Sequence, residues 1–140
     1  MKRNFQFDDV SIVRWGDQCI DLHNAYDLER FATNRAGDEI EIRFKRNAHA
    51  IDPGSLPATV TLRCAGEARL AFNDLCVIMA PITNEAVEIA YFDEGCDWLS
   101  FLDEPMAQRQ EPQGLHLAFD SGLVIRVFCG EAKFTVDDQR

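Results

Sequence analysis

Near its end the chain carries two apolar runs that are separated by a short turn sequence. The runs span 115–119 and 123–129, and the triplet Asp-Ser-Gly lies between them at 120–122. This triplet suits a three-residue hairpin loop, in which a type I turn ends with glycine in the left-handed region. Such a loop places Leu117 opposite Ile125 on one apolar face, because successive side chains alternate across a strand. The pattern predicts a β-hairpin of defined register.

A third strand is predicted directly after this hairpin. Gly130-Glu131 has the glycine-first order of a two-residue type II′ turn, and it would place Val127 opposite Phe134. All three strands would then share one hydrophobic face, and a slip of one residue would send half of that face to solvent. We therefore expect a C-terminal three-stranded meander.

Alternation of apolar and polar residues recurs over much of the chain. It is strictest at 39–45, whose isoleucines and phenylalanine would face inward, and it returns at 87–91. Residues 58–64 and 68–72 also alternate, and the short segment between them predicts a second hairpin. These segments indicate a sheet that has one buried and one solvent-facing side.

One segment has helical spacing instead. Leu28 and Phe31 lie three residues apart, Asn24 can cap the start, and Gly37 follows the end. We expect one short helix over about residues 24–35, packed against a sheet.

Together these elements predict a mainly β (β-rich α+β) fold, an antiparallel sheet curled into a barrel or paired as a sandwich. A length of 140 residues suits a single domain spanning 1–140. A hydrophobic content of 46% with ten phenylalanines excludes a disordered chain. No apolar run approaches the ~20 residues of a membrane span, and no apolar stretch of a secretory signal follows the first basic residues. We expect a cytoplasmic protein that does not bind membranes.

The charge and the motifs narrow the class of function. A net charge of −10 argues against nucleic acid, which calls for a basic surface, and favours either simple solubility or a basic partner protein. The sequence contains no G-x-S-x-G, no G-x-x-x-x-G-K, no G-x-G-x-x-G and no H-E-x-x-H. We therefore expect a non-enzymatic module.

The meander register would gather a locally basic and aromatic patch on the outer side of the last strands. One interpretation is an ordinary solvent-facing surface, on which basic residues keep exposed strands from pairing with other chains. Another is a recognition surface for an acidic partner. A general base is a third interpretation of its histidine, although no nucleophile can be named. The predicted binding patch consists of His116, Arg126, Phe128, Lys133 and Thr135.

An acidic loop is the second candidate site. Asp93, Glu94 and Asp97 surround a glycine, and carboxylate oxygens can hold Ca²⁺ or Mg²⁺. The alternating acidic pattern and the downstream glutamate of an EF-hand are missing. We expect an acidic turn without a metal, and no cofactor.

The cysteines form an odd, scattered set of five without a C-x-x-C. Such thiols in a cytoplasmic protein are mostly small buried hydrophobes, so no disulfide is expected. Cys19 and His23 lie four apart, but a zinc site needs further ligands.

These observations favour a binding or interaction module, for example an acidic inhibitor such as a bacterial immunity-type protein. The alternative is a small-ligand-binding barrel, or a small enzyme, with His116 or His23 in a pocket at the barrel mouth. Strand edges must be paired or blunted, so a homodimer is also expected, in which Arg126 meets acidic residues 137–138 of the second copy.

Overall fold

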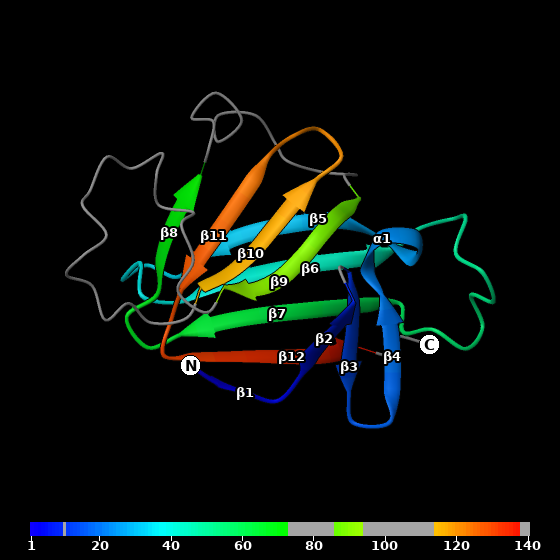
Figure 1. Cartoon of the computed structure of the whole chain (residues 1–140), viewed down its shortest axis with the longest axis horizontal. Coiled ribbons are helices and arrows are strands. Elements are labelled where there is room, and N and C mark those ends of the chain that lie inside the picture. Colours follow the sequence, from blue (N-terminus) through cyan, green and yellow to red (C-terminus); the bar gives the residue numbers. More distant parts are fainter. Residues whose placement is uncertain (10, 73–85, 94–113, 138–140) are drawn as a thin grey trace.

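The computed structural model describes residues 1–9, 11–72, 86–93 and 114–137, and strands dominate this part of the chain (Figure 1). The elements in chain order are β1 (Lys2–Arg3), β2 (Gln6–Asp9), β3 (Ile12–Trp15), β4 (Gln18–Asp21), α1 (Leu22–Ala25), β5 (Tyr26–Thr33), β6 (Ile40–Arg46), β7 (Thr59–Ala65), β8 (Arg69–Phe72), β9 (Val87–Asp93), β10 (Gly114–Phe119), β11 (Val124–Phe128) and β12 (Glu131–Asp137).

The strands form three sheets. A five-stranded sheet has the order β1-β12-β7-β6-β5, a four-stranded sheet the order β8-β11-β10-β9, and a three-stranded sheet the order β2-β3-β4. Figure 1 shows the strands of the four-stranded sheet running steeply across those of the five-stranded sheet, with the three-stranded sheet at the opposite end. The mainly β prediction is confirmed, and among the described strands the arrangement is a sandwich-like stack of sheets rather than a closed barrel.

The core lies between these sheets. The predicted alternation at 39–45 is confirmed, because Ile40, Ile42 and Phe44 of β6 are buried and the side chains between them are not. Aromatic contacts close one end of the core, where the rings of Phe5, just before β2, and Trp15 of β3 lie 5.7 Å and 6.2 Å from that of Phe134. Side chains with no exposed surface include Ile42, Leu62, Leu115, Leu117, Ile125 and Phe134.

The predicted hairpin at 120–122 is confirmed in both turn and register. Leu117 pairs with Ile125 across β10 and β11, and the Phe119 amide donates to the Leu123 carbonyl at 2.9 Å. Gly122 has a φ of +84°, a conformation that glycine adopts without steric cost. Local turn chemistry therefore determines this part of the fold.

The predicted three-stranded meander is wrong beyond this hairpin, because β12 does not pair with β11. Phe134 of β12 pairs with Leu62 of β7, whereas Val127 of β11 pairs with Leu70 of β8. The predicted hairpin of 58–64 with 68–72 is wrong for the same reason. In both places the chain leaves one sheet and enters the other.

The two crossings meet at one corner of the molecule. Gly66 follows β7 with a φ of +76°, and its carbonyl accepts a 2.8 Å hydrogen bond from the amide of Gly130, which precedes β12. Each glycine thus supports the other crossing. Figure 1 shows this corner at the left, where β7 ends and β12 begins.

The helix predicted at 24–35 is also wrong. The helix α1 is one turn, capped by Asp21, and the chain then continues as β5, antiparallel to β6. A β-bulge between Leu28 and Arg30 shifts the register, so that Leu28 pairs with Phe44 and Phe31 with Ile42. Two residues three apart therefore share the strand's inner face, which explains the helical spacing.

Candidate functional site

The five residues of the predicted binding patch are divided between two sheets. Lys133 and Thr135 lie on β12 and are exposed. His116, Arg126 and Phe128 lie on β10 and β11, with 2%, 3% and 8% of their surface exposed. The prediction that these five residues form one exposed patch is therefore wrong. The crossing at Gly130 carries β12 away from β11, which separates the two groups.

The three buried residues form a compact cluster on the side of the four-stranded sheet opposite its apolar row. The Arg126 guanidinium carbon lies 4.7 Å from the centre of the Phe128 ring, a cation–π geometry. Gly114, opposite Phe128 in the register, leaves room for both side chains, because a Cβ there would lie 3.2 Å from Arg126 Nε. The sheet thus holds a guanidinium against an aromatic face beside a buried histidine.

In the backbone register, β9 lies beside β10. His116 pairs with Arg126 on one side and with Tyr91 on the other, and Gly114 pairs with Asp93. Asp93 of the predicted acidic loop is thus the last residue of a strand. Glu94 and Asp97 lie outside the described residues. Histidine, arginine, tyrosine and aspartate therefore occupy neighbouring register positions on three adjacent strands.

Lys133 and Thr135 belong to the outer face, by which we mean the side of the five-stranded sheet that carries Glu41, Arg43, Thr61, Arg63, Lys133 and Thr135. The register places Thr135 beside Thr61 and Arg43, and Lys133 beside Arg63. The sequence prediction missed Thr61, Arg43 and Arg63. The charged alternate positions of β6 were the signal that could have identified this face.

Ion pairs between neighbouring strands cross the outer face. Arg63 lies 3.0 Å from Glu41, and Arg43 lies 2.9 Å from Glu29. Thr61 is only 5% exposed between the flanking long side chains. The outer face therefore has threonines at its centre and paired charges beside them.

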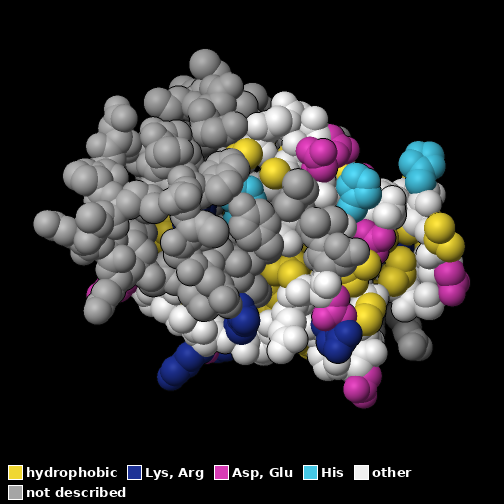
Figure 2. Space-filling model, in the orientation of Figure 1, with side chains coloured by type: hydrophobic (Ala, Val, Ile, Leu, Met, Phe, Trp, Pro, Cys, Tyr) yellow, Lys and Arg dark blue, Asp and Glu magenta, His cyan; other side chains and the backbone are white. Residues whose placement is uncertain are grey.

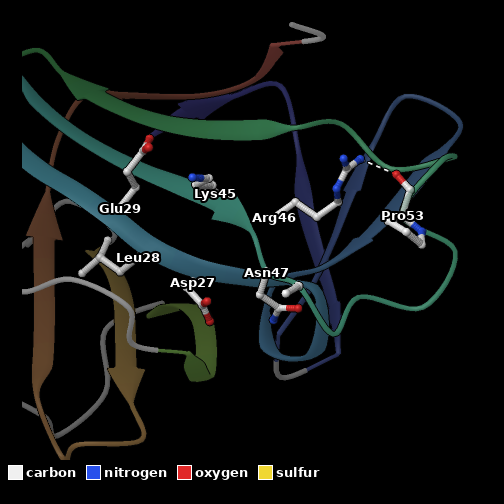
Figure 3. A pocket seen from close by; sticks show the side chains of 8 residues that line it. Asp27, Leu28, Glu29, Lys45, Arg46, Asn47 and Pro53 are labelled. Atoms are coloured by element: carbon white, nitrogen blue, oxygen red, sulfur yellow. Dashed lines mark hydrogen bonds between the residues drawn. The ribbon is translucent and has the colours of Figure 1, made fainter. Parts of the chain in front are cut away.

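An open groove lies at one end of this face (Figure 3). Arg46 spans its rim, where the guanidinium donates to the carbonyls of Pro53 and Leu56 and fixes the loop after β6. The groove encloses about 610 Å³ and is lined by Asp27, Leu28, Glu29, Lys45, Arg46, Asn47, Ala48 and Pro53. Its charged and exposed lining resembles a surface groove more than an apolar ligand pocket.

His23 serves to join two elements. Its Nδ1 lies 2.8 Å from the carbonyl oxygen of Val87 and so ties α1 to β9. Cys19, four residues earlier, is exposed on β4. Within the described ranges, no three His, Cys, Asp or Glu side chains lie together as metal ligands would.

The contact predicted for the homodimer is also corrected. Arg126 is buried within its own sheet and cannot reach an acidic cluster on a second copy. Asp137 is exposed at the end of β12, and Asp138 lies outside the described residues. The dimer itself stays a prediction.

Comparisons with known proteins identified no similar protein. No protein-family model, no curated protein and no solved structure matches this chain. In the part of the chain that the structure describes, none of the helical segments has the length and apolar character needed to cross a bilayer.

Proposed function

We propose that this protein is a non-enzymatic binding module that acts in the cytoplasm and docks a partner protein on its outer face. The observation that carries the proposal is the row of Arg43, Thr61 and Thr135, which continues across three paired strands. Protein interfaces have a polar rim and are enriched in Arg, whereas small ligands need concave sites.

The charge of the whole chain suggests the kind of partner. A net charge of −10 attracts a basic protein over a distance and speeds its encounter, even though the charges on the outer face are largely paired. On the side of the molecule shown in Figure 2, Lys and Arg side chains lie toward the lower margin, and carboxylates are scattered over the upper, right and lower parts of the surface. An acidic inhibitor of a basic protein, such as an immunity-type protein, is the concrete form of the proposal.

A second candidate is a small-ligand site or a small enzyme at the buried cluster. The observation in its favour is that His116 and Arg126 are both buried and adjacent across two strands. An anionic group would suit a guanidinium and an imidazole. A shift in melting temperature with small carboxylates or phosphates, lost in Arg126→Gln, would favour this candidate.

The test begins with the partner. The tagged protein captures partners from an extract of the producing cells, with products of neighbouring genes as the first candidates. Each candidate is then purified, and its binding is measured by calorimetry. We expect a basic protein whose association rate falls steeply with added salt.

A matched pair of variants then tests the surface. Thr135→Arg places a long charged side chain on the outer face, whereas Gln18→Arg places the same side chain on the exposed β3–β4 hairpin. We expect a loss of affinity of about 100-fold for Thr135→Arg and a change within about twofold for Gln18→Arg, as for a residue inside an interface and one outside it. Equal affinities for both variants would show that the outer face is not the docking surface.

A further inference from the structure

The charges of the outer face are arranged symmetrically along two of its strands. On β12, Lys133 and Asp137 lie at equal steps on either side of Thr135, and all three side chains are exposed. On β6, Glu41 and Lys45 lie at equal steps on either side of the middle outward-facing residue. Alternate side chains of a strand point to the same side of the sheet. Each of these strands therefore presents a cation and a carboxylate at equal distances from its centre.

The centres of these strands form one row across the sheet. Thr135 of β12 pairs with Thr61 of β7, and Thr61 pairs with Arg43 of β6. We call these three residues the central row. A half-turn about the central row lays the outer face of a second copy on the first with the strands aligned, as in sheets that stack face to face about 10 Å apart. Each side chain beside the row then meets the one from the other side of the row on the second copy.

This half-turn sets opposite charges face to face. Lys133 meets Asp137 of the second copy, Glu41 meets Lys45 of the second copy, and symmetry repeats each contact. Within the described part of a single chain, Lys45 and Asp137 take part in no ion pair. Both charges are therefore free to pair with a second copy.

The remaining positions accept the same arrangement. Thr61 is only 5% exposed, so the centre does not hold the two faces apart. Thr59 would meet Arg63 of the second copy, and its hydroxyl is buried without a hydrogen-bond partner among the described residues. The exposed guanidinium of Arg63 has N–H groups to donate to such a hydroxyl. Arg43 would meet its own equivalent, but Glu29 at 2.9 Å neutralises it.

We propose that the outer face pairs with that of a second copy by this half-turn, which gives a symmetric homodimer. A net charge of −10 makes two copies repel each other, and the outer face is a surface on which cations outnumber carboxylates. The dimer covers the docking surface of the proposed function until a partner displaces the second copy. That last step rests on the proposed function, whereas the dimer does not.

Charge reversals at one facing pair test the dimer. Sedimentation equilibrium of the full chain under reducing conditions is expected to show a species of twice the chain mass of 15.9 kDa. Lys133→Glu and Asp137→Lys each set like charges face to face, so each should raise the dimer dissociation constant at least about 100-fold. Arg14→Glu on β3 is the matched control, with a change within about twofold. Arg14 and Lys133 are both 57% exposed, and each forms an ion pair within its own chain.

An equimolar mixture of Lys133→Glu and Asp137→Lys is the decisive measurement. In a mixed dimer the introduced glutamate meets the introduced lysine, and the native Asp137 meets the native Lys133. We expect a heterodimer whose dissociation constant lies within about tenfold of that of the wild type. The double variant Lys133→Glu/Asp137→Lys should recover the homodimer for the same reason. Circular dichroism and thermal melting check that each variant is folded.

Three outcomes would overturn the proposal. The first is a wild-type monomer at every concentration. The second is a dimer that neither reversal weakens, or that Arg14→Glu weakens equally, because the contact would then lie on another surface or depend on net charge alone. The third is that folded single variants fail to associate in the mixture and the double variant stays monomeric. The purified chain is measured without a partner protein, so these results are independent of the test of partner binding.

Discussion

The amide of Gly130 donates a 2.8 Å hydrogen bond to the carbonyl of Gly66, and this bond joins the two places where the chain passes from one sheet to the other. The residues are far apart in the sequence but form one corner. Because β7 and β12 pair directly beside it, the corner aligns the five-stranded sheet with the ends of the four-stranded sheet. It therefore connects the two main layers of the fold.

Gly130→Ala is expected to lower the free energy of unfolding by about 1–3 kcal/mol, as overpacking against fixed atoms does. Its Cβ would lie 3.2 Å from a main-chain oxygen that cannot rotate away. Gly54→Ala is the matched control, since the nearest atom to its Cβ is a flexible carboxylate oxygen at 3.9 Å. Urea unfolding measures both variants. Equal stabilities for the two would contradict the close packing of the corner.

The same corner explains why part of the fold could be predicted from the sequence and part could not. The 120–122 hairpin depends on residues next to one another, so its turn sequence determines Leu117 and Ile125 as partners. Gly130 followed by Glu131 is an equally favourable turn sequence. The strand that follows it, β12, nevertheless pairs with β7 and not with β11, because that pairing depends on a segment far away in the sequence. Local sequence patterns predicted most strands correctly. They predicted which strands pair only where a tight turn joins the two.

The candidate site shows the same limit. The sequence correctly placed His116 opposite Arg126, because their register follows from the hairpin. Their burial did not follow, since alternation shows which face a side chain points to but not whether that face is covered. The helix prediction failed for a related reason, because a bulge at Glu29 gives a strand helical spacing.

Asn4→Ala is expected to lower the free energy of unfolding by about 1–3 kcal/mol, because it leaves two main-chain groups of β12 without their partner. The Asn4 side chain donates to the Phe134 carbonyl at 2.9 Å and accepts from the Phe134 amide at 2.8 Å, so it continues the pairing of β1 with β12. Hydrogen exchange at the Phe134 amide should become faster. Gln6→Ala, an exposed change on β2, is the control, and equal exchange in both variants would contradict this role.

Gly114→Ala tests the buried cluster. Its Cβ would lie 3.2 Å from Arg126 Nε and 3.4 Å from the Phe128 ring, so the variant should lose about 1 kcal/mol or more of stability. In a Phe128→Leu background, the smaller side chain lets Arg126 move, and the cost should fall by about 0.5–1 kcal/mol, as for residues in contact. Thermal and urea unfolding of the four proteins give this coupling. Strict additivity would show that Gly114 does not press on the Arg126–Phe128 pair.

The dependence of stability on pH tests the raised pKa of the buried Cys64 thiol. In the unfolded chain Cys64 ionises near its ordinary pKa of 9.0, whereas a hydrogen bond to Cys129 and burial raise its pKa in the folded protein. Below pH 9 the contribution of Cys64 is fully present. Above it the unfolded state binds fewer protons than the folded state, so the free energy of unfolding falls as the pH rises. The lowered pKa of Cys129 acts in the opposite direction below pH 9, where stability rises with pH.

Cys64→Val removes the contribution of this thiol while keeping a small apolar side chain in the core. Between about pH 9 and about pH 10.5, the stability of wild type minus that of Cys64→Val should fall by about 1.4 kcal/mol per pH unit, the value for one proton. Urea unfolding under reducing conditions measures this difference, and the titration of groups that do not interact with Cys64 cancels in it. The titration of Cys129, which loses the bond from Cys64 in the variant, is measured separately with Cys129→Val. Cys19→Val, at an exposed thiol, is expected to follow the wild type. A difference between wild type and Cys64→Val that stays constant over this pH range would contradict the raised pKa of Cys64.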